Sequence, residues 1–170
     1  MSLNQENNAA VAEEAEIVID KNLTGPSSFL LLEDENILVV DECGHQLKLF
    51  SKYGELKKTI GKKGKEKEEF YYPTDAVFFN GVIYITDRYN HKVKAFGLDD
   101  GRAIWEAGGY GEGKGMLIEP FGISLVGKEA IAVSDFGNSR ISVFDLNGNF
   151  LFVFGEKGIE KEYYESNSFK

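Results

Sequence analysis

The sequence is poor in several residue types, and each shortage excludes a class of structure. It contains one cysteine, Cys43, in 170 residues, so no disulfide bond can form within the chain. No stretch approaches the roughly 18 consecutive apolar residues that a membrane-spanning helix requires. The N-terminal region has no basic segment followed by an apolar one, and the lack of such a secretory signal favours a cytoplasmic location.

Positive charge is also scarce. Nineteen Lys and Arg residues stand against 28 Asp and Glu residues, which gives a formal net charge of −9. Proteins that bind nucleic acid usually carry a basic surface, so this balance disfavours a nucleic-acid partner. Six lysines do cluster between residues 57 and 67, but Glu66, Glu68 and Glu69 lie among them, which is typical of a solvated linker.

The chain contains only three prolines, and their spacing reveals its organisation. Pro26, Pro73 and Pro120 are separated by 47 residues in both intervals. Internal periods in the forties are typical of solenoids and propellers. A pair of glycines recurs in the same register, at Gly61 and Gly64, Gly108 and Gly111, and Gly155 and Gly158. The sequence therefore predicts three copies of one structural unit.

Each copy contains four short apolar runs separated by turn residues, a pattern that predicts strands rather than helices. In the first copy these runs cover residues 29–32, 37–40, 47–50 and 56–60. Asn80-Gly81, Asp100-Gly101 and Asn147-Gly148 are typical hairpin turns. Several of the runs have no polar alternation, so we expect neighbouring sheets to cover both of their faces. An all-β fold of stacked four-stranded antiparallel blades, as in a propeller, follows from this pattern.

One motif in each copy resembles the repeat of the NHL β-propeller family. In that family a proline and an apolar run are followed by Asp-x-x-Asn-His-[Arg/Lys], an apolar residue, two further residues and Phe. Residues 87–96 match this motif nearly in full, residues 135–144 have Ser139 in place of the histidine, and residues 41–50 keep His45 but have Gly44 and Gln46. The resemblance covers residues 23–158.

NHL propellers are typically six-bladed, so the resemblance implies a partial β-propeller of three four-stranded antiparallel blades, half of a six-bladed ring. We expect three NHL-type blades within residues 17–158, at about 23–69, 70–116 and 117–158. A disordered acidic tail is expected at 1–16, an outer strand of a preceding blade at 16–20, and the start of a truncated next blade, or a tail, at 159–170.

On this interpretation both ends of the chain look cut. The faces of the first and last blades would then be left uncovered, and large exposed apolar faces usually mark an interface. Two occupants remain open: a second copy that closes the ring as a homodimer, or missing blades of a longer chain.

Propeller topology places the turns between second and third strands on the same rim as the linkers between blades, and we expect the binding surface there. The rim binding candidates combine aromatic and cationic side chains, which are frequent in recognition sites: Arg88, Tyr89, His91, Tyr110, Phe136 and Arg140. Residues that recur between copies are assigned to the structure of the turns, because repetition within one chain is what a scaffold requires: Asp41, Asp87, Asp135, Asn90 and Asn138. Lys92 and Arg140 are expected to pair with these carboxylates.

Together these features predict a non-enzymatic scaffold that binds a protein or peptide through its rim, without metal or cofactor. One alternative is an RNA-binding NHL propeller, which would need a positive rim. The other is half of a metal-dependent propeller lyase or hydrolase, because residues 41–47 and 138–141 resemble stretches of the peptidyl-hydroxyglycine amidating lyase, a zinc enzyme. In that family histidines follow the repeat prolines, where this chain has Ser27, Thr74 and Phe121, so the set of zinc ligands is incomplete.

Overall fold

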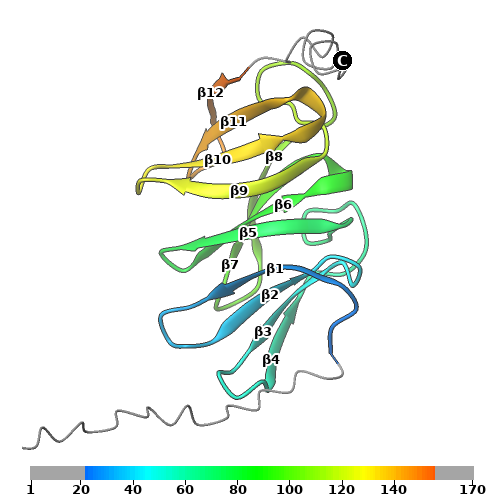
Figure 1. Ribbon diagram of the computed structural model, residues 1–170, viewed down its shortest axis with the longest axis vertical. Helices are drawn as coiled ribbons and strands as arrows, with labels where there is room; N and C mark the ends of the chain where they lie inside the picture. The colour runs from blue at the N-terminus through cyan, green and yellow to red at the C-terminus, as the bar shows by residue number, and fades with distance from the viewer. Residues whose placement is uncertain (1–21, 156–170) are drawn as a thin grey trace, which may run out of the picture.

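The strands of the computed structural model form three separate sheets that stack side by side (Figure 1). The structure describes residues 22–155. The expected acidic tail at 1–16, the expected strand at 16–20 and the expected segment at 159–170 therefore lie outside the described residues.

Each sheet is a four-stranded antiparallel meander in which sequential strands pair. Blade 1 contains β1 (Pro26–Leu31), β2 (Ile37–Asp41), β3 (Gln46–Phe50) and β4 (Leu56–Ile60). Blade 2 contains β5 (Pro73–Phe79), β6 (Val82–Asp87), β7 (Lys92–Gly97) and β8 (Ala103–Gly108), with the short 3₁₀ helix η1 (Arg88–Asn90) between β6 and β7. Blade 3 contains β9 (Pro120–Val126), β10 (Ala130–Asp135), β11 (Arg140–Asp145) and β12 (Phe150–Phe154), with η2 (Phe136–Asn138) between β10 and β11.

The three prolines mark the first residue of each inner strand, a position where a missing backbone N–H is tolerated. Hydrogen bonds between residues exactly one repeat apart join these strands. The Ser27 hydroxyl donates to the Thr74 carbonyl at 2.7 Å, and the Thr74 hydroxyl donates to the Phe121 carbonyl at 2.7 Å. Residues one repeat apart in the sequence thus lie at equivalent positions of neighbouring blades.

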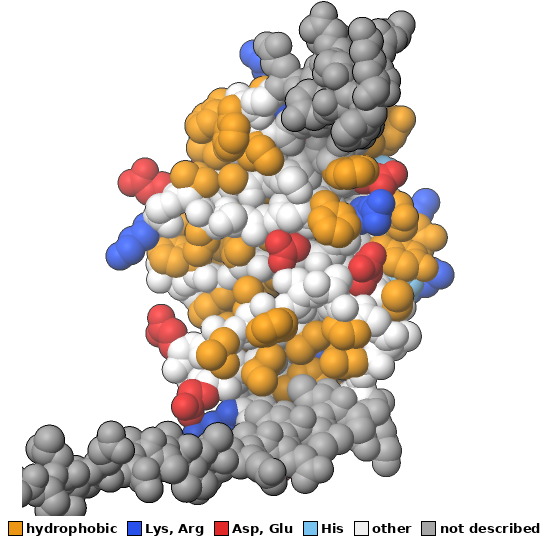
Figure 2. All heavy atoms as spheres, in the orientation of Figure 1, with side chains coloured by type: hydrophobic (Ala, Val, Ile, Leu, Met, Phe, Trp, Pro, Cys, Tyr) orange, Lys and Arg blue, Asp and Glu red, His pale blue; other side chains and the backbone are white. Residues whose placement is uncertain are grey.

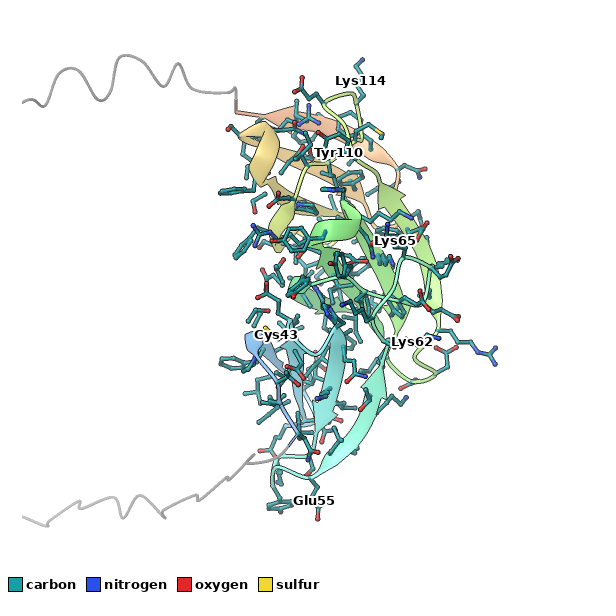
Figure 3. The ribbon with its side chains drawn as sticks, turned by 90° about the vertical axis from the view of Figure 1, so that its right-hand side faces the viewer. Cys43, Glu55, Lys62, Lys65, Tyr110 and Lys114 are labelled. Carbon is teal, nitrogen blue, oxygen red and sulfur yellow. The ribbon has the colours of Figure 1, made fainter. Side chains whose placement is uncertain are left out.

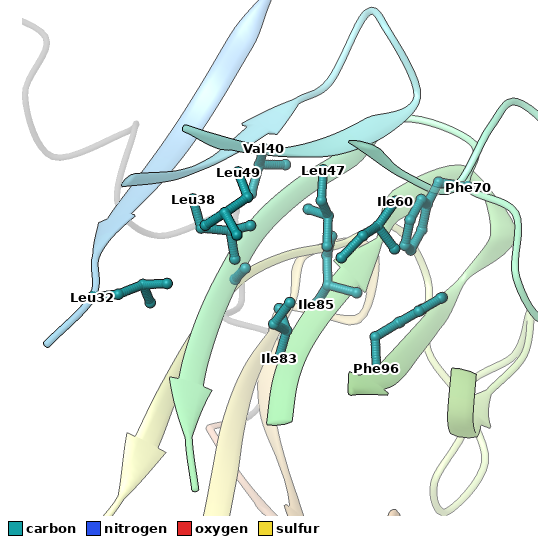
Figure 4. Close-up of a cluster of buried hydrophobic side chains, with 11 residues drawn as sticks. Leu32, Leu38, Val40, Leu47, Leu49, Ile60, Phe70, Ile83, Ile85 and Phe96 are labelled. Atoms are coloured by element: carbon teal, nitrogen blue, oxygen red, sulfur yellow. The ribbon is translucent and has the colours of Figure 1, made fainter. Parts of the chain in front are cut away.

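Two apolar layers hold the three blades together. The first lies between blades 1 and 2, where side chains such as Leu38 and Leu47 point toward Ile83 and Phe96 (Figure 4). The second lies between blades 2 and 3 and includes Tyr84, Val93, Leu117, Ile131 and Phe144. Blade 2 is therefore covered on both faces, which suits a strand such as β6 that has no polar alternation.

The predicted fold class is confirmed: the protein is an all-β partial β-propeller of three four-stranded antiparallel blades. The hairpin predicted at Asn80-Gly81 forms with both residues in the left-handed region, at φ values of 49° and 79°. Among residues 22–155, no helix has the length and apolar character needed to cross a bilayer.

Candidate binding surface at the loop rim

The repeated aspartates lie at the centre of the rim turns and are completely buried. In each blade, Oδ1 of this residue accepts the backbone N–H of the residue two positions before the repeat proline. The donors are Thr24 for Asp41 at 2.9 Å, Tyr71 for Asp87 at 2.7 Å, and Ile118 for Asp135 at 2.8 Å. Each aspartate therefore joins the end of the second strand to the entry of the inner strand of its own blade.

A cation balances each of these buried carboxylates and also binds the segment that leads into the inner strand of the same blade. Lys94 Nζ lies 3.0 Å from Asp87 Oδ2 and donates to the Glu66 and Glu69 carbonyls at 2.9 and 2.5 Å. In blade 1, Lys48 Nζ lies 2.7 Å from Asp41 Oδ2. Burial raises the pKa of Asp41, but the hydrogen bond from Lys48, with those from the Gly25 and Thr24 amides, outweighs burial and leaves the pKa below its usual value.

Blade 3 obtains its cation from a different position. Arg140 Nε lies 2.7 Å from Asp135 Oδ2, as expected from the sequence, and its NH2 donates to the Met116 carbonyl at 2.8 Å. The residue equivalent to Lys94 is Ser142, whose short side chain cannot reach the linker. Arg140 thus has structural contacts, and its place among the rim binding candidates stays a prediction.

The pairing expected for Lys92 is wrong. Its Nζ lies 2.5 Å from Glu106 Oε1 on the outer strand β8, and Lys94 takes the place beside Asp87. In the sheet register Asp87 is directly opposite Lys92 and Glu106 is directly opposite Lys94, but each lysine pairs diagonally. The pairs match in burial, because the fully buried Lys94 balances the fully buried Asp87 and the partly exposed Lys92 binds the partly exposed Glu106. The sequence analysis missed Lys94, whose side chain is fully buried.

The asparagines of the turns also join neighbouring segments. Asn90 Nδ2 donates to the Gly64 carbonyl at 2.9 Å and to Asp87 Oδ2 at 2.7 Å. Asn138 Nδ2 makes the equivalent bonds to the Gly111 carbonyl at 3.0 Å and Asp135 Oδ2 at 2.8 Å. These contacts place each of the two glycine-containing linkers against the turn of the next blade.

Both histidines serve the same geometry one blade further along. His45 Nδ1 accepts the Tyr72 N–H at 3.0 Å, and His91 Nδ1 accepts the Glu119 N–H at 3.1 Å. Tyr72 and Glu119 immediately precede repeat prolines and have positive φ values of 58° and 50°. A histidine that accepts through Nδ1 holds this strained entry to the next inner strand, so His91 has a structural contact in addition to its predicted place in the binding set.

This contact leads to a pH-dependent prediction for His45. Burial, followed by the nearby charge of Lys63, lowers the pKa of His45. A protonated ring could also no longer accept the Tyr72 N–H at Nδ1. In the unfolded chain a histidine takes up its proton near pH 6.5, whereas the His45 ring of the folded protein stays neutral to lower pH. The unfolded state therefore binds more protons in this window, and we expect the stability to fall as the pH decreases from about 7 toward 5. Thermal unfolding at closely spaced pH values would measure this.

The matched variant is His45→Asn, since asparagine tolerates the positive φ of 56° and offers an acceptor oxygen. We expect its melting temperature to depend less on pH between about 7 and 5 than that of the parent protein. An unchanged pH profile would assign the loss of stability to other groups.

Aromatic side chains that do not recur between copies gather on the rim beside these turns. We call Tyr71, Tyr72, Arg88, Tyr89 and Phe121 the rim cluster. The Tyr72 and Tyr89 ring centroids are 5.2 Å apart, and Tyr71 lies 5.7 Å from Tyr89. The Arg88 guanidinium carbon lies 4.9 Å from the Tyr89 ring and 5.5 Å from the Phe121 ring, so the cluster extends from the junction of blades 1 and 2 to blade 3.

The charge of the rim cluster is held in place but stays accessible. Arg88 NH2 lies 2.7 Å from Glu119 Oε2, and this hydrogen bond raises the pKa of Arg88. About a quarter of the Arg88 side chain remains exposed, together with 39% of Tyr89 and 47% of Phe121. Figure 2 shows hydrophobic side chains exposed over all three blades, with charged groups beside them. A partner could therefore meet aromatic faces, a cation and an anion within one small area.

The remaining rim candidates lie outside this cluster. Tyr110 lies on the linker after blade 2. Figure 3 labels it together with Lys62 and Lys65, which lie on the linker after blade 1. Its ring contacts His91 at 5.1 Å between centroids and is 71% exposed. Phe136, in η2, is also largely exposed.

Tyr71, Tyr72, Phe121 and Glu119 were missed as candidates. A signal for them was present in the sequence, because they lie next to the repeat prolines at positions where the three copies differ. Thr24-Gly25, Tyr71-Tyr72 and Ile118-Glu119 are equivalent pairs, yet only the second is aromatic. The scaffold therefore does not require an aromatic side chain at these positions.

The described residues include no group of three or more His, Cys, Asp and Glu side chains arranged to hold a metal ion. Two of the positions where the amidating lyase has histidines carry hydroxyls engaged between blades, since Ser27 and Thr74 donate to carbonyls of the following blade. The third, Phe121, belongs to the rim cluster.

The stacked meanders and their linkers define the chain as a β-propeller. A family model described as "6-bladed beta-propeller" matches residues 19–107, and the chain belongs to this family. Three four-stranded blades are present in the described residues.

Comparison with individual proteins agrees with this assignment. The chain is 30% identical over 146 residues to "Protein brain tumor" of Drosophila melanogaster, covering 81% of this chain and 13% of that protein. It is similar in structure to hydrazine synthase of Kuenenia stuttgartiensis, with a TM-score of 0.64 and 13% identity, over 80% of this chain and 37% of the other. Virginiamycin B lyase of Staphylococcus aureus matches with a TM-score of 0.63 and 17% identity, over 82% and 44%. The chain thus spans a minor part of each, and the two structural matches concern the fold alone.

Proposed function

We propose that this protein is a non-enzymatic NHL-type propeller segment, with blades at about 23–69, 70–116 and 117–158, that binds a protein or peptide through its rim. The observation that carries the proposal is the rim cluster, in which Arg88 lies between the exposed rings of Tyr89 and Phe121. Aromatic and arginine side chains dominate the energetics of protein recognition. Tyr, Arg and Phe at one accessible site therefore favour a polypeptide partner.

Two observations support the NHL assignment. The Asp, Asn and His of the motif at 87–91 each make a contact that orders the junction between blades. These contacts explain why a repeat would keep these residue types at this spacing. The similarity to "Protein brain tumor" extends over most of the chain.

The repeated and the unrepeated rim residues differ in their contacts, and this difference supports a binding role for the rim cluster. The polar atoms of the repeated residues Asp87, Asn90 and Lys94 form hydrogen bonds within the chain. Large parts of the Tyr89 and Phe121 side chains are exposed. Covering this aromatic surface with a partner would make the free energy of binding more favourable.

The test is the double variant Arg88→Ala with Tyr89→Ala. Peptides selected from a displayed random library on the unmodified protein are the probes. We expect the double variant to weaken their binding by at least about 30-fold, because two central contacts of the site are removed. The melting temperature should change little, since neither side chain belongs to the buried layers.

The matched control is Tyr53→Ala. Tyr53 is 74% exposed and lies in the turn between β3 and β4, at the end of blade 1 away from the rim. We expect this variant to bind the peptides as the parent does. Equal losses in both variants, or unfolding of the double variant, would contradict a rim site. Salt-sensitive retention of single-stranded RNA would favour the RNA-binding alternative, and a stoichiometric divalent metal in the purified protein would favour the lyase alternative.

A further inference from the structure

Each junction between blades contains an apolar linker side chain that covers a glycine of the preceding blade. A β-carbon built on Gly61 would lie 2.4 Å from the Phe70 ring, and one built on Gly108 would lie 2.9 Å from Leu117 Cδ1. Phe70 and Leu117 are fully buried. A linker side chain in contact with a bare glycine is thus a repeated feature of the interface between blades.

Blade 3 repeats the glycine, but no described side chain covers it. Gly155 has a φ of +87°, close to the +81° of Gly61. The described atoms nearest to a β-carbon built on Gly155 are backbone atoms of residues 139–141, at 3.7 to 4.0 Å. A groove of about 540 Å³ lies here, between Phe154, Ile141, Arg140 and Ser134.

The exposed surface around this groove is apolar. Phe152 and Phe154 alternate along β12 on one face of the sheet, and each is more than half exposed. The equivalent face of blade 1 is buried against blade 2, where Ile60 occupies the position of Phe154. Blade 3 therefore presents, among the described residues, the surface that a further blade would cover.

Blade 1 carries the complementary side chain at the opposite end of the stack. Leu23 precedes Pro26 by three residues, as Phe70 and Leu117 precede Pro73 and Pro120. It is half-buried and lines an apolar cleft of about 330 Å³ with Phe29, Ile37 and Val39.

The segment around Leu23 is already held in the linker conformation. Lys48 bonds to Asp41 and to the Asn22 carbonyl, and Asn22 precedes its repeat proline by four residues. Lys94 binds the equivalent carbonyl of Glu69, and Arg140 that of Met116. Leu23 is thus placed relative to blade 1 as Phe70 is placed relative to blade 2.

We propose that the free face of blade 3 binds the blade 1 end of a second copy of this chain, with Leu23 of the second copy against Gly155. The two internal junctions are two examples of this interface with the same pairing of linker side chain and glycine. The family is six-bladed, and two copies of the three described blades supply six. A twofold ring contains two identical new junctions and leaves neither end face exposed.

The first test is the mass of the 170-residue chain in solution, measured by sedimentation across a range of concentrations. We expect a dimer with twice the 19.0 kDa of the chain. Leu23→Asp and Ile141→Asp should each weaken the dimer at least about 100-fold, because each places a charge in an apolar contact. Leu23→Ala, which adds no charge, should weaken it at least about 10-fold through lost burial.

A charge exchange tests whether the two positions meet. The variant Leu23→Lys with Ile141→Asp should dimerise more tightly than either Leu23→Lys or Ile141→Asp alone, because both junctions would then contain an ion pair. Ile104→Asp, at a half-exposed position on the outer strand of blade 2, is the control and should leave the mass unchanged.

Three outcomes would overturn the proposal. A particle of 19.0 kDa at every concentration would show that no second copy occupies the groove. A monomer is also the result expected if Tyr164 of the same chain occupies the groove beside Gly155, since Tyr164 follows Leu117 by one repeat of 47 residues. A dimer that persists in Leu23→Asp, or open-ended growth to larger assemblies, would place the contact elsewhere.

Discussion

Lys94→Met is expected to lower the free energy of unfolding by about 3–5 kcal/mol, because it leaves the fully buried carboxylate of Asp87 without its cation. The carbonyls of Glu66 and Glu69 would also lose their donor. Domains of this size are stabilised by about 5–15 kcal/mol in total, so a large part of the stability would be lost. Urea unfolding followed by circular dichroism would measure the change.

The same substitution two residues earlier is the matched control. Lys92→Met lies on the same strand and breaks the partly exposed pair with Glu106, so we expect a loss of at most about 1 kcal/mol. The double variant Asp87→Asn with Lys94→Met should cost less than the sum of the two single changes, since each removes the other's partner. Equal effects of Lys92→Met and Lys94→Met would contradict the assignment of Lys94 as the internal counter-ion.

Gly61→Ala is expected to destabilise the protein by about 2–5 kcal/mol, for two separate reasons. Alanine is strained at the φ of +81°, and its β-carbon would lie 2.4 Å from the ring of Phe70. Phe70 is fully buried between blades 1 and 2 and cannot move aside without disturbing that layer. Thermal or urea unfolding would give the magnitude.

Gly81→Ala separates the two reasons. Gly81 has nearly the same φ, +79°, but nothing lies within 4 Å of a β-carbon built there. We expect a cost of only about 1–2 kcal/mol, from backbone strain alone. If the two variants lose the same stability, Phe70 does not press on Gly61 and the linker contact that we describe between blades is not tight.

Much of the fold could be read from the sequence because it repeats. The three prolines at intervals of 47 residues fixed the number of units, and the short apolar runs fixed four strands for each. The buried aspartates could also be assigned to the turns, since a residue that serves every blade belongs to the scaffold.

The candidate site was only partly predictable. Arg88 and Tyr89 were chosen from the sequence, but Tyr71, Tyr72 and Phe121 were not, because they lie on a linker and on the inner strand β9, which meet only when the blades stack. The choice between Lys92 and Lys94 as the partner of Asp87 likewise depended on which lysine the folded chain buries, because Lys92 is the one directly opposite Asp87 in the sheet.

The sequence by itself determined the repeat, the strands and the residues of the turns, because these depend on local propensities and on a period that short-range patterns express. Only the tertiary structure decided which lysine is buried, which aromatic rings share the rim, and that Gly155 lacks the side chain that covers Gly61 and Gly108. These features arise from contacts that join different strands and linkers, between residues 7 to 33 positions apart, and the stacking of the blades decides which of them meet.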